Sequence, residues 1–398
     1  MQKLAWIAEN MGLETDESIA SAPRTAFPAE YSLADTPECP ASQPDPAAQR
    51  RDGLPIHMAA LPGGKRVPLL KTLLTSACER NCFYCPFRAG RDMRRVTFKP
   101  DEMAHLVMDL ARARTINGAF ISSGIAGGGP RTQDRLLDTA EILRQKLHYQ
   151  GYLHLKLMPG AEVAQIERAM QLADRVSVNL EAPNPNRLAL LAPQKQMMEE
   201  LLEPLRVVDS IRRSQPARLG WNGRWPSTTT QFVVGAVGES DLELLQTVSY
   251  LYRKLHLARS YFSGFHPVTD TPFEDHRATN PWRQHRLYQA AFLLHDYGFE
   301  LEDLPFQNGE NLAVEVDPKV AWARQNLDEA PLEINRAARR ELLKVPGFGP
   351  KAVEAILHAQ VRGGRLRSLD DLKALGIAAG RAAPFILLDG HRPPRQLS

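Results

Sequence analysis

Three cysteines, Cys78, Cys82 and Cys85, stand within eight positions of one another. A loop this short cannot satisfy disulfide geometry among all three thiols, but it can direct three thiolates at one polynuclear iron–sulfur cluster. Three ligands are one fewer than a closed cluster needs, so one iron would be open to a non-protein ligand. The residues alone leave open a partial zinc site or three unrelated core thiols, although zinc sites usually pair two Cys-x2-Cys units or add a His pair.

The Cys-x3-Cys-x2-Cys spacing, with an aromatic residue before the last cysteine, resembles the radical SAM enzyme family. In that family S-adenosylmethionine chelates the open iron through its amino and carboxylate groups. The resemblance implies that Cys78, Cys82 and Cys85 hold a [4Fe-4S] cluster, that S-adenosylmethionine is the second cofactor, and that Tyr84 borders its adenine. It also implies a 5′-deoxyadenosyl radical as the reactive species and an electron donor such as a flavodoxin or ferredoxin as a partner.

The stretch after the second expected strand contains Ser122, Ser123 and Gly124. The family usually carries Gly-Gly-Glu there, and that motif holds the methionine amino group. The two serines and the glycine are therefore expected to contact S-adenosylmethionine, but the family's carboxylate is missing from this position.

The fourth expected strand contains alternating polar residues, Ser177, Asn179 and Glu181. Alternation places them on one face, and three polar groups on a buried parallel strand need a reason. We expect them to bind the cosubstrate, with Glu181 as the candidate for the missing carboxylate. Gly235, after the fifth strand, resembles the family's glycine motif beside the adenine, where a residue without a side chain allows close backbone approach.

Six short apolar runs alternate with helical patterns and predict parallel β/α units. Such units can close as an open doubly wound sheet or as a barrel, and the resemblance favours a partial (β/α)6 TIM-like barrel of the radical SAM type. The site would then lie at the carboxyl ends of the strands. The expected strands are Leu69–Thr75, Gly118–Ser123, Tyr152–Met158, Arg175–Leu180, Thr229–Gly235 and Ser260–Phe265. The expected helices are 1–12, one that opens at Pro100, 131–148, 161–173, 196–213, 240–256 and 282–296.

Composition is that of an ordinary globular protein, with 43% hydrophobic and 24% charged residues in 398. No apolar run approaches the roughly 20 residues of a membrane span, and the N-terminus is too polar for a secretory signal. We therefore expect a cytoplasmic protein without a membrane partner. Cys39 lies outside the motif in a Pro- and Ala-rich stretch and is taken as incidental.

The C-terminal part resembles the helix-hairpin-helix DNA-binding motif. A helix expected to be capped by Asn335 precedes a Pro-Gly-Phe-Gly turn, and a second helix begins at Pro350. Such a turn presents backbone N–H groups at a helix N-terminus and can bind a phosphate oxygen without reading bases. The residues that the resemblance assigns to DNA binding are Pro346, Gly347, Phe348, Gly349 and Lys351.

Charge is unevenly distributed along the chain. Residues 331–398 contain 12 Lys or Arg and 6 Asp or Glu, a net charge of +6, although the whole chain carries only +3. A basic segment of this kind suits a polyanionic partner. The expected organisation is a partly disordered N-terminal extension over 1–54, a radical SAM core barrel over 55–298, a connector over 299–330 and an all-α helix-hairpin-helix domain over 331–391.

Together the two motifs resemble bacterial radical SAM proteins described as putative DNA modification or repair proteins. The expected function is therefore a radical S-adenosylmethionine enzyme that acts on DNA, bound without sequence specificity through residues 331–391. Two alternatives stay open from the sequence. One is a radical enzyme acting on a small molecule or a protein, with the tail as a tether, and the other is a non-catalytic iron–sulfur DNA-binding protein.

Overall fold

The computed structural model describes residues 1–10, 54–60 and 66–394. The expectations for Cys39 and for most of the N-terminal extension therefore lie outside the described residues. The main feature is a seven-stranded sheet in the order β1-β2-β3-β4-β5-β6-β7, in which β1 runs antiparallel to β2 and the other neighbours are parallel. The strands are β1 Ile56–Ala60, β2 Arg66–Leu73, β3 Gly118–Ser122, β4 Tyr152–Lys156, β5 Arg175–Ser177, β6 Ser227–Val234 and β7 Arg259–Gly264.

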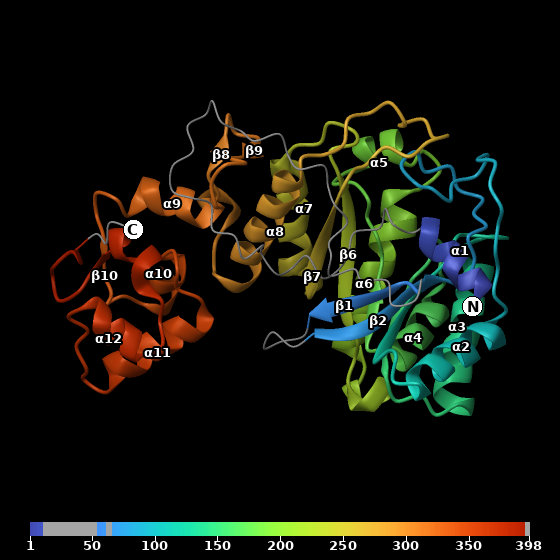
Figure 1. Ribbon diagram of the computed structural model, residues 1–398, viewed down its shortest axis with the longest axis horizontal. Coiled ribbons are helices and arrows are strands. Elements are labelled where there is room, and N and C mark those ends of the chain that lie inside the picture. The colour runs from blue at the N-terminus through green and yellow to red at the C-terminus, as the bar shows by residue number, and fades with distance from the viewer. Residues whose placement is uncertain (11–53, 61–65, 395–398) are drawn as a thin grey trace. The chain divides into compact units, whose positions relative to one another are not determined.

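Helices follow the strands and cover one face of the sheet, where α2, α3, α4 and α6 pack successively against one another (Figure 1). The α-helices of this part of the chain are α1 Gln2–Asn10, α2 Pro100–Arg112, α3 Gly129–Glu141, α4 Val163–Leu172, α5 Pro185–Leu191, α6 Glu203–Ser214, α7 Asp241–Leu255 and α8 Pro281–Asp296. A π-helical segment adjoins two of these helices: Ile142–Lys146 follows α3, and Met197–Leu202 precedes α6.

The sequence predicted these elements because each carries its own local signal. All five residues of β3 are buried, as a parallel strand covered by helices requires. Helix α2 begins with Pro100 at its first position, and the Glu102 carboxylate accepts the Lys99 backbone N–H at 2.8 Å. The expected parallel-strand half-barrel is confirmed. The sequence reasoning missed β1 and α5, and it made the fourth strand too long, since β5 ends at Ser177.

The chain divides into two compact units, one of Met1–Glu239 with Tyr250–Gln284 and one of Ser240–Ser249 with His285–Ser398. The second unit has its own buried core, which includes Leu342, Phe348 and Ile356. Its further elements are β8 Phe306–Gln307, β9 Asn311–Leu312, α9 Pro318–Asn326, β10 Leu332–Glu333, α10 Arg339–Lys344, α11 Pro350–Val361, α12 Leu369–Ala374 and β11 Ile386–Leu387, together with single turns of 3₁₀-helix.

Helix α9 belongs to this core although it lies in the stretch expected to be a connector. Ala323 is fully buried in the cluster, and Trp322 packs against it and meets the Phe299 ring edge-on at 5.5 Å. Stable folding of residues 331–391 therefore draws on residues that precede them, while the domain boundaries themselves stay a prediction.

Asn335 does not cap α10, so that expectation was wrong. The helix begins three residues later than predicted, with Ala338 at its N-cap and the Glu341 carboxylate accepting the Ala338 N–H at 2.8 Å. The Asn335 side chain instead pairs with the backbone of Leu366, accepting its N–H at 2.8 Å and donating to its carbonyl at 2.9 Å. A residue with both donor and acceptor can satisfy a distant backbone segment as well as a helix end.

Candidate active site

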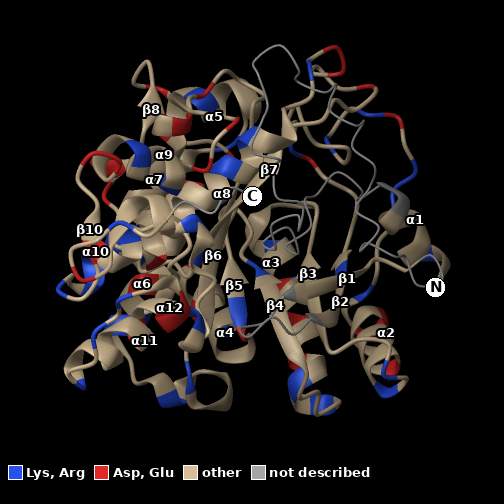
Figure 2. Ribbon diagram, turned by 60° about the vertical axis from the view of Figure 1, so that its left-hand side comes forward, with Lys and Arg blue, Asp and Glu red and all other residues tan. Residues whose placement is uncertain are grey.

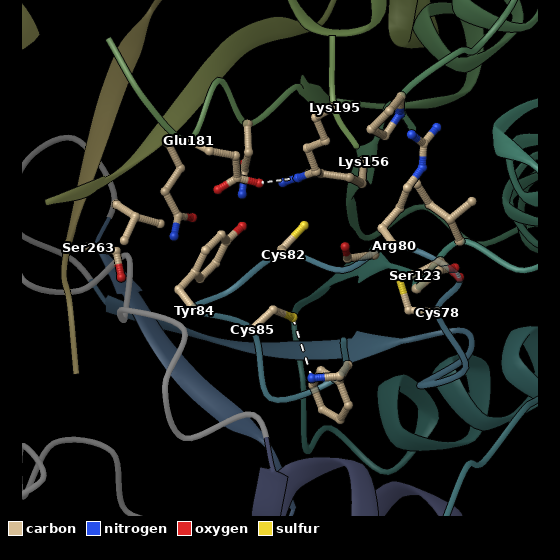
Figure 3. Close-up of a pocket in the computed structure, with 18 of the residues that line it drawn as sticks. Cys78, Arg80, Cys82, Tyr84, Cys85, Ser123, Lys156, Glu181, Lys195 and Ser263 are labelled. Atoms are coloured by element: carbon tan, nitrogen blue, oxygen red, sulfur yellow. Dashed lines mark hydrogen bonds and ion pairs between the residues drawn. The ribbon is translucent and has the colours of Figure 1, made fainter. Parts of the chain in front are cut away.

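The three cysteines of the motif line one pocket at the carboxyl ends of the sheet strands. All three thiols are free, and in Figure 3 Cys78 lies beside Ser123 while Cys82 and Cys85 lie beside Tyr84. In the described residues no group of three or more His, Cys, Asp or Glu side chains is arranged to hold a single metal ion. The pocket is lined by residues of the cysteine loop and of several strand ends, including Leu73, Lys156 and Gly264.

Two arginines that follow the third cysteine, Arg91 and Arg95, hold the cysteine loop in place. Arg95 donates to the carbonyls of Ser76 and Phe87 at 2.9 and 2.8 Å and to that of Arg88 at 2.7 Å. Arg91 donates to the Pro86 carbonyl at 2.8 Å. The two guanidinium groups therefore use these hydrogen-bond donors to hold the backbone of the loop. The Phe87 N–H also donates to the Cys85 sulfur at 3.4 Å, a contact of the kind that tunes an iron–sulfur centre.

Gly124 lies directly under the start of the cysteine loop. Its N–H donates to the Thr75 carbonyl at 2.7 Å, and a Cβ at this position would stand 2.3 Å from the carbonyl oxygen of Ala77. Only glycine allows so close an approach of two backbone segments. Glu79 ties the same loop to the segment that precedes α3, since its carboxylate accepts the Gly127 N–H at 3.0 Å and that of Gly128 at 3.1 Å.

Most of the residues predicted to contact S-adenosylmethionine line the pocket with the cysteines. They are Tyr84, Ser122, Ser123, Gly124, Asn179 and Glu181. Lys156 lines it too, at the end of β4. The structure thus brings residues from the cysteine loop and from the ends of three strands together, as expected for the carboxyl-terminal end of a parallel barrel.

Ser177 and Gly235 are not among the lining residues. The Ser177 hydroxyl lies 2.8 Å from Nε2 of the buried His154. Gly235 adopts a φ of +89°, and a Cβ there would stand 2.1 Å from the Thr279 hydroxyl oxygen. Both positions have a structural reason for their residue type, and their proposed contacts with the cosubstrate stay a prediction.

Glu181 has an unusual backbone and an unusual side chain. Its φ of 66° lies in the left-handed region, which residues other than glycine rarely adopt and which clusters at functional sites. Two hydrogen bonds to β6 hold it there, from its N–H to the Gln231 carbonyl at 3.0 Å and from the Val233 N–H to its carbonyl at 2.8 Å. One carboxylate oxygen, Oε1, accepts from Lys195 at 2.8 Å, while the buried Oε2 has no hydrogen-bond partner in the described residues.

Lys195 is a pocket residue that the sequence reasoning missed. It lies in residues 191–200, which run from the last residue of α5 into the π-helical segment Met197–Leu202 and which we call the strap. The strap is bound to the cysteine loop. Arg80 donates to the Gln194 carbonyl and meets Glu200 at 2.5 Å, and the Phe83 N–H donates to the Leu191 carbonyl at 2.9 Å. No motif or periodicity marks Lys195, so only the folded chain reveals it.

Burial and these charges set the protonation states around the pocket. Burial raises the pKa of the Cys82 thiol, and the nearby Lys195 ammonium opposes that effect. Burial, followed by the negative charge of Glu181, raises the pKa of Tyr84 well above its ordinary value, so the phenol remains a hydrogen-bond donor. Burial alone would lower the pKa of Lys195, but Cys82 and Glu181 outweigh it and raise that pKa.

The turn predicted to contact DNA joins α10 to α11 within the second unit. The side chains of Pro346 and Phe348 are buried, whereas Gly347 and Lys351 are exposed and Gly349 is half-buried. Gly347 adopts a φ of +87°, but Gly349 has an ordinary φ of −101° and is the N-cap of α11. Of the five predicted residues, Pro346 and Phe348 therefore bury their side chains in the core. Gly347, Gly349 and Lys351 supply the groups that are exposed or partly exposed.

Residues 72–250 match the family model of the Radical SAM superfamily. They therefore form a radical SAM domain, a domain of enzymes that use a [4Fe-4S] cluster and S-adenosylmethionine. A search of curated proteins finds no match. No helix in the described residues combines the length and the apolar character needed to cross a bilayer.

Solved structures with a similar fold include the [FeFe]-hydrogenase maturase HydG from Carboxydothermus hydrogenoformans, at 14% identity and a TM-score of 0.45 over 57% of this chain and 51% of that one. Methylornithine synthase PylB matches at 13% identity and a TM-score of 0.46, over 58% of this chain and 64% of that one. The methyltransferase TsrM from Kitasatospora setae matches at 15% identity and a TM-score of 0.39, over 52% and 39%. The chain thus spans between about two fifths and two thirds of these proteins.

The residues present fit the two cofactors of the domain. Three thiols line one pocket, and three thiolate ligands suit a cluster with one iron left open. The unpartnered Oε2 of Glu181 is a buried acceptor that a ligand donor would satisfy, because an unsatisfied buried polar atom costs free energy. The set of donors and acceptors is therefore complementary to a cluster and a charged cosubstrate.

Proposed function

We propose that this protein is a radical S-adenosylmethionine enzyme that modifies or repairs DNA, which it holds through a helix-hairpin-helix turn in its second unit. The radical chemistry follows from the domain, and the DNA substrate is the new element. The observation that carries it is the turn between α10 and α11. There a glycine at φ +87°, an exposed Lys351 and the N-terminus of a 12-residue helix occur together.

In this proposal Cys78, Cys82 and Cys85 bind the [4Fe-4S] cluster, and Tyr84, Ser122, Ser123, Gly124, Asn179 and Glu181 surround S-adenosylmethionine. The bound cofactors supply a carbon-centred radical that removes a hydrogen atom from the substrate. The chain's own part is to orient the ligands, exclude water and place charge. Arg95 and Gly124 shape the cysteine loop, and Phe87 shields the cluster side of the pocket, since its side chain is only 5% exposed.

The turn would bind phosphate through backbone groups. The first N–H groups of an α-helix have no partner inside the helix, and the helix dipole favours an anion there. Lys351 adds a positive charge, and Gly349 leaves room for a phosphate oxygen to approach the backbone. Figure 2 shows both basic and acidic residues on the helices of this unit. Over residues 331–398 the 12 Lys or Arg outnumber the 6 Asp or Glu, which supports non-specific attraction of a polyanion. Such contacts carry no base information, so binding should be independent of sequence.

Mass spectrometry of nucleosides tests the proposal most directly. The full chain, reconstituted anaerobically with iron and sulfide, is incubated with DNA, S-adenosylmethionine and a reductant, and the DNA is then digested. We expect an altered nucleoside, or the disappearance of a lesion, that requires all components. A matched preparation of Cys82→Ala should give neither product nor cluster absorption.

Other outcomes favour the alternatives. Cleavage of S-adenosylmethionine without any effect on DNA, together with no salt-sensitive DNA binding, would favour a small-molecule or protein substrate with the second unit as a tether. DNA binding by a cluster-loaded protein that never cleaves S-adenosylmethionine would favour a non-catalytic iron–sulfur DNA-binding protein. Stoichiometric zinc after anaerobic purification would contradict the cluster assignment itself.

A further inference from the structure

The buried ion pair of Glu181 and Lys195 has unused hydrogen-bonding capacity that faces the pocket. The side chains are only 5% and 10% exposed, and Lys195 Nζ donates to Glu181 Oε1 at 2.8 Å. The Tyr84 hydroxyl also hydrogen-bonds with the Glu181 carboxylate. An ammonium has three donors and a carboxylate accepts through two oxygens. In the described residues Oε2 accepts nothing. Burying an ion pair costs free energy when some of its donors and acceptors lack hydrogen-bond partners, unless further groups bind to them.

A zwitterion supplies the missing partners. Free α-amino acids and the methionine end of S-adenosylmethionine carry an ammonium beside a carboxylate, and the Glu181–Lys195 pair offers the opposite charges in the same pocket (Figure 3). The α-amino group would donate to Glu181 Oε2, and the α-carboxylate would accept from Lys195. The backbone of Glu181 is left-handed, and both its N–H and its carbonyl are hydrogen-bonded to β6. This conformation costs free energy, and residues held in such conformations cluster at functional sites.

The strap that carries Lys195 is fixed to the cysteine loop. Arg80, inside the cysteine motif, reaches both the Gln194 carbonyl and Glu200, and the Asn81 N–H donates to the Gln194 side chain at 3.2 Å. Lys195 follows Gln194 directly in the chain. The position of its ammonium therefore depends on contacts made by the loop that would hold the cluster.

We infer that Lys195 recognises the α-carboxylate of S-adenosylmethionine as the partner of Glu181, and that Arg80 positions it through the strap. This inference rests on the proposed radical chemistry and adds to it a recognition residue that lies outside the sequence motifs. Lys195 makes charge-assisted contacts to the cosubstrate, while Arg80 acts only through Gln194 and Glu200. No covalent or redox step is assigned to either residue.

The test compares two ligands with the reconstituted holoenzyme, by anaerobic equilibrium dialysis without reductant so that nothing is cleaved. The ligands are S-adenosylmethionine and its decarboxylated form, which lacks only the carboxylate. Lys195→Met should weaken S-adenosylmethionine binding about ten- to a hundredfold, since one charge-assisted hydrogen bond is lost. It should leave the affinity for the decarboxylated ligand nearly unchanged, because that ligand has no group for the lysine to bind.

Lys156→Met is the matched control, because it removes an equal charge from the same pocket. It should leave the preference for the carboxylate unchanged. Arg80→Met should reduce the preference, and it should add little when Lys195 is already Met, because residues acting through one contact are not additive. Lys195→Met leaves the buried Glu181 carboxylate without its counter-charge, which could by itself disturb the pocket. The double variant Lys195→Met with Glu181→Gln removes both charges. It should lose the same preference for the carboxylate and keep the cluster intact.

Three results would overturn the inference: unchanged S-adenosylmethionine affinity in Lys195→Met, an equal loss for both ligands, or loss of the preference in Lys156→Met. An equal loss with a shifted cluster spectrum would assign Lys195 to the cluster instead. These results leave the proposed function standing, whereas a cluster-loaded wild-type protein that binds neither ligand would refute the proposed function itself.

Discussion

Replacing Gly124 by alanine tests whether the cysteine loop is held by backbone packing as the structure shows. The added Cβ would stand 2.3 Å from the Ala77 carbonyl oxygen, 3.0 Å from its carbon and 3.1 Å from the Thr75 carbonyl oxygen. An ordinary contact between carbon and oxygen is about 3.3 Å or more, so one segment must move by about 1 Å. All three neighbours are backbone atoms, and no side-chain rotation can relieve the clash.

The displaced segment must carry Cys78 with it, because Ala77 is the preceding residue. Overpacking of this kind typically costs about 1–3 kcal/mol. We therefore expect Gly124→Ala to lower the free energy of unfolding of the apoprotein by that amount and to reduce iron and sulfide loading. The former is measured by urea denaturation, and the latter by chemical analysis and visible absorption after anaerobic reconstitution.

Gly380→Ala is the matched control, because no heavy atom lies within 4 Å of a Cβ built at that position. It should leave both stability and loading unchanged. A Gly124→Ala protein that loads a full cluster and unfolds at the wild-type urea concentration would show that the loop tolerates displacement, and the packing argument would be refuted.

Four further predictions concern the pocket and the second unit. Glu181→Gln should weaken S-adenosylmethionine binding about ten- to a hundredfold in equilibrium dialysis while the cluster spectrum is retained, and unchanged affinity would exclude Glu181 from the site. Gly349→Val should weaken DNA binding in fluorescence anisotropy without affecting the cluster or S-adenosylmethionine cleavage, because a Cβ there meets only the Tyr297 hydroxyl at 3.6 Å. The wild-type affinity should fall with salt at a logarithmic slope of about −2 to −4, as expected for a few phosphate contacts, and a slope near zero would contradict DNA binding. Burial lowers the pKa of Lys319 from 10.5 to about 7, with Asp317 opposing that shift and Arg381 adding to it, so the unfolded chain binds more protons above pH 7. Stability of the second unit should therefore be lowest below pH 7 and rise by about 2–3 kcal/mol towards pH 9. Urea unfolding followed by tryptophan fluorescence should show this rise in the wild type and not in Lys319→Met.

Lys319 also shows how the second unit supports its turn. Its ammonium donates to the Phe348 carbonyl at 2.6 Å and lies 4.5 Å from the centre of the Tyr297 ring. Both residues that flank this lysine, Tyr297 before the expected connector and Phe348 in the turn, belong to the same unit. A DNA-binding fragment should therefore begin before α9, since a fragment starting at residue 331 would lose the Lys319 donor and leave the Phe348 carbonyl buried without a partner.

The sequence alone determined the features that depend on neighbouring residues. Cysteine spacing predicted the loop chemistry, and the apolar alternation predicted six parallel strands within a few residues of their observed ends. The second helix of the tail begins at Pro350, as the turn chemistry indicated. Each of these signals lies within about ten residues of chain, where backbone preferences and hydrophobic periodicity act directly.

The tertiary structure decided the contacts between residues that are distant along the chain. It places Lys195 on Glu181, and it packs α9 into the core of the second unit. It also gives Asn335 a backbone partner 31 residues away in place of a helix to cap. Such pairings depend on which surfaces meet when the strands and helices pack, and packing routinely overrides local preference. The buried charges of Glu181 and Lys195 in the pocket belong to this group, because burying them becomes favourable only once the fold supplies their partners.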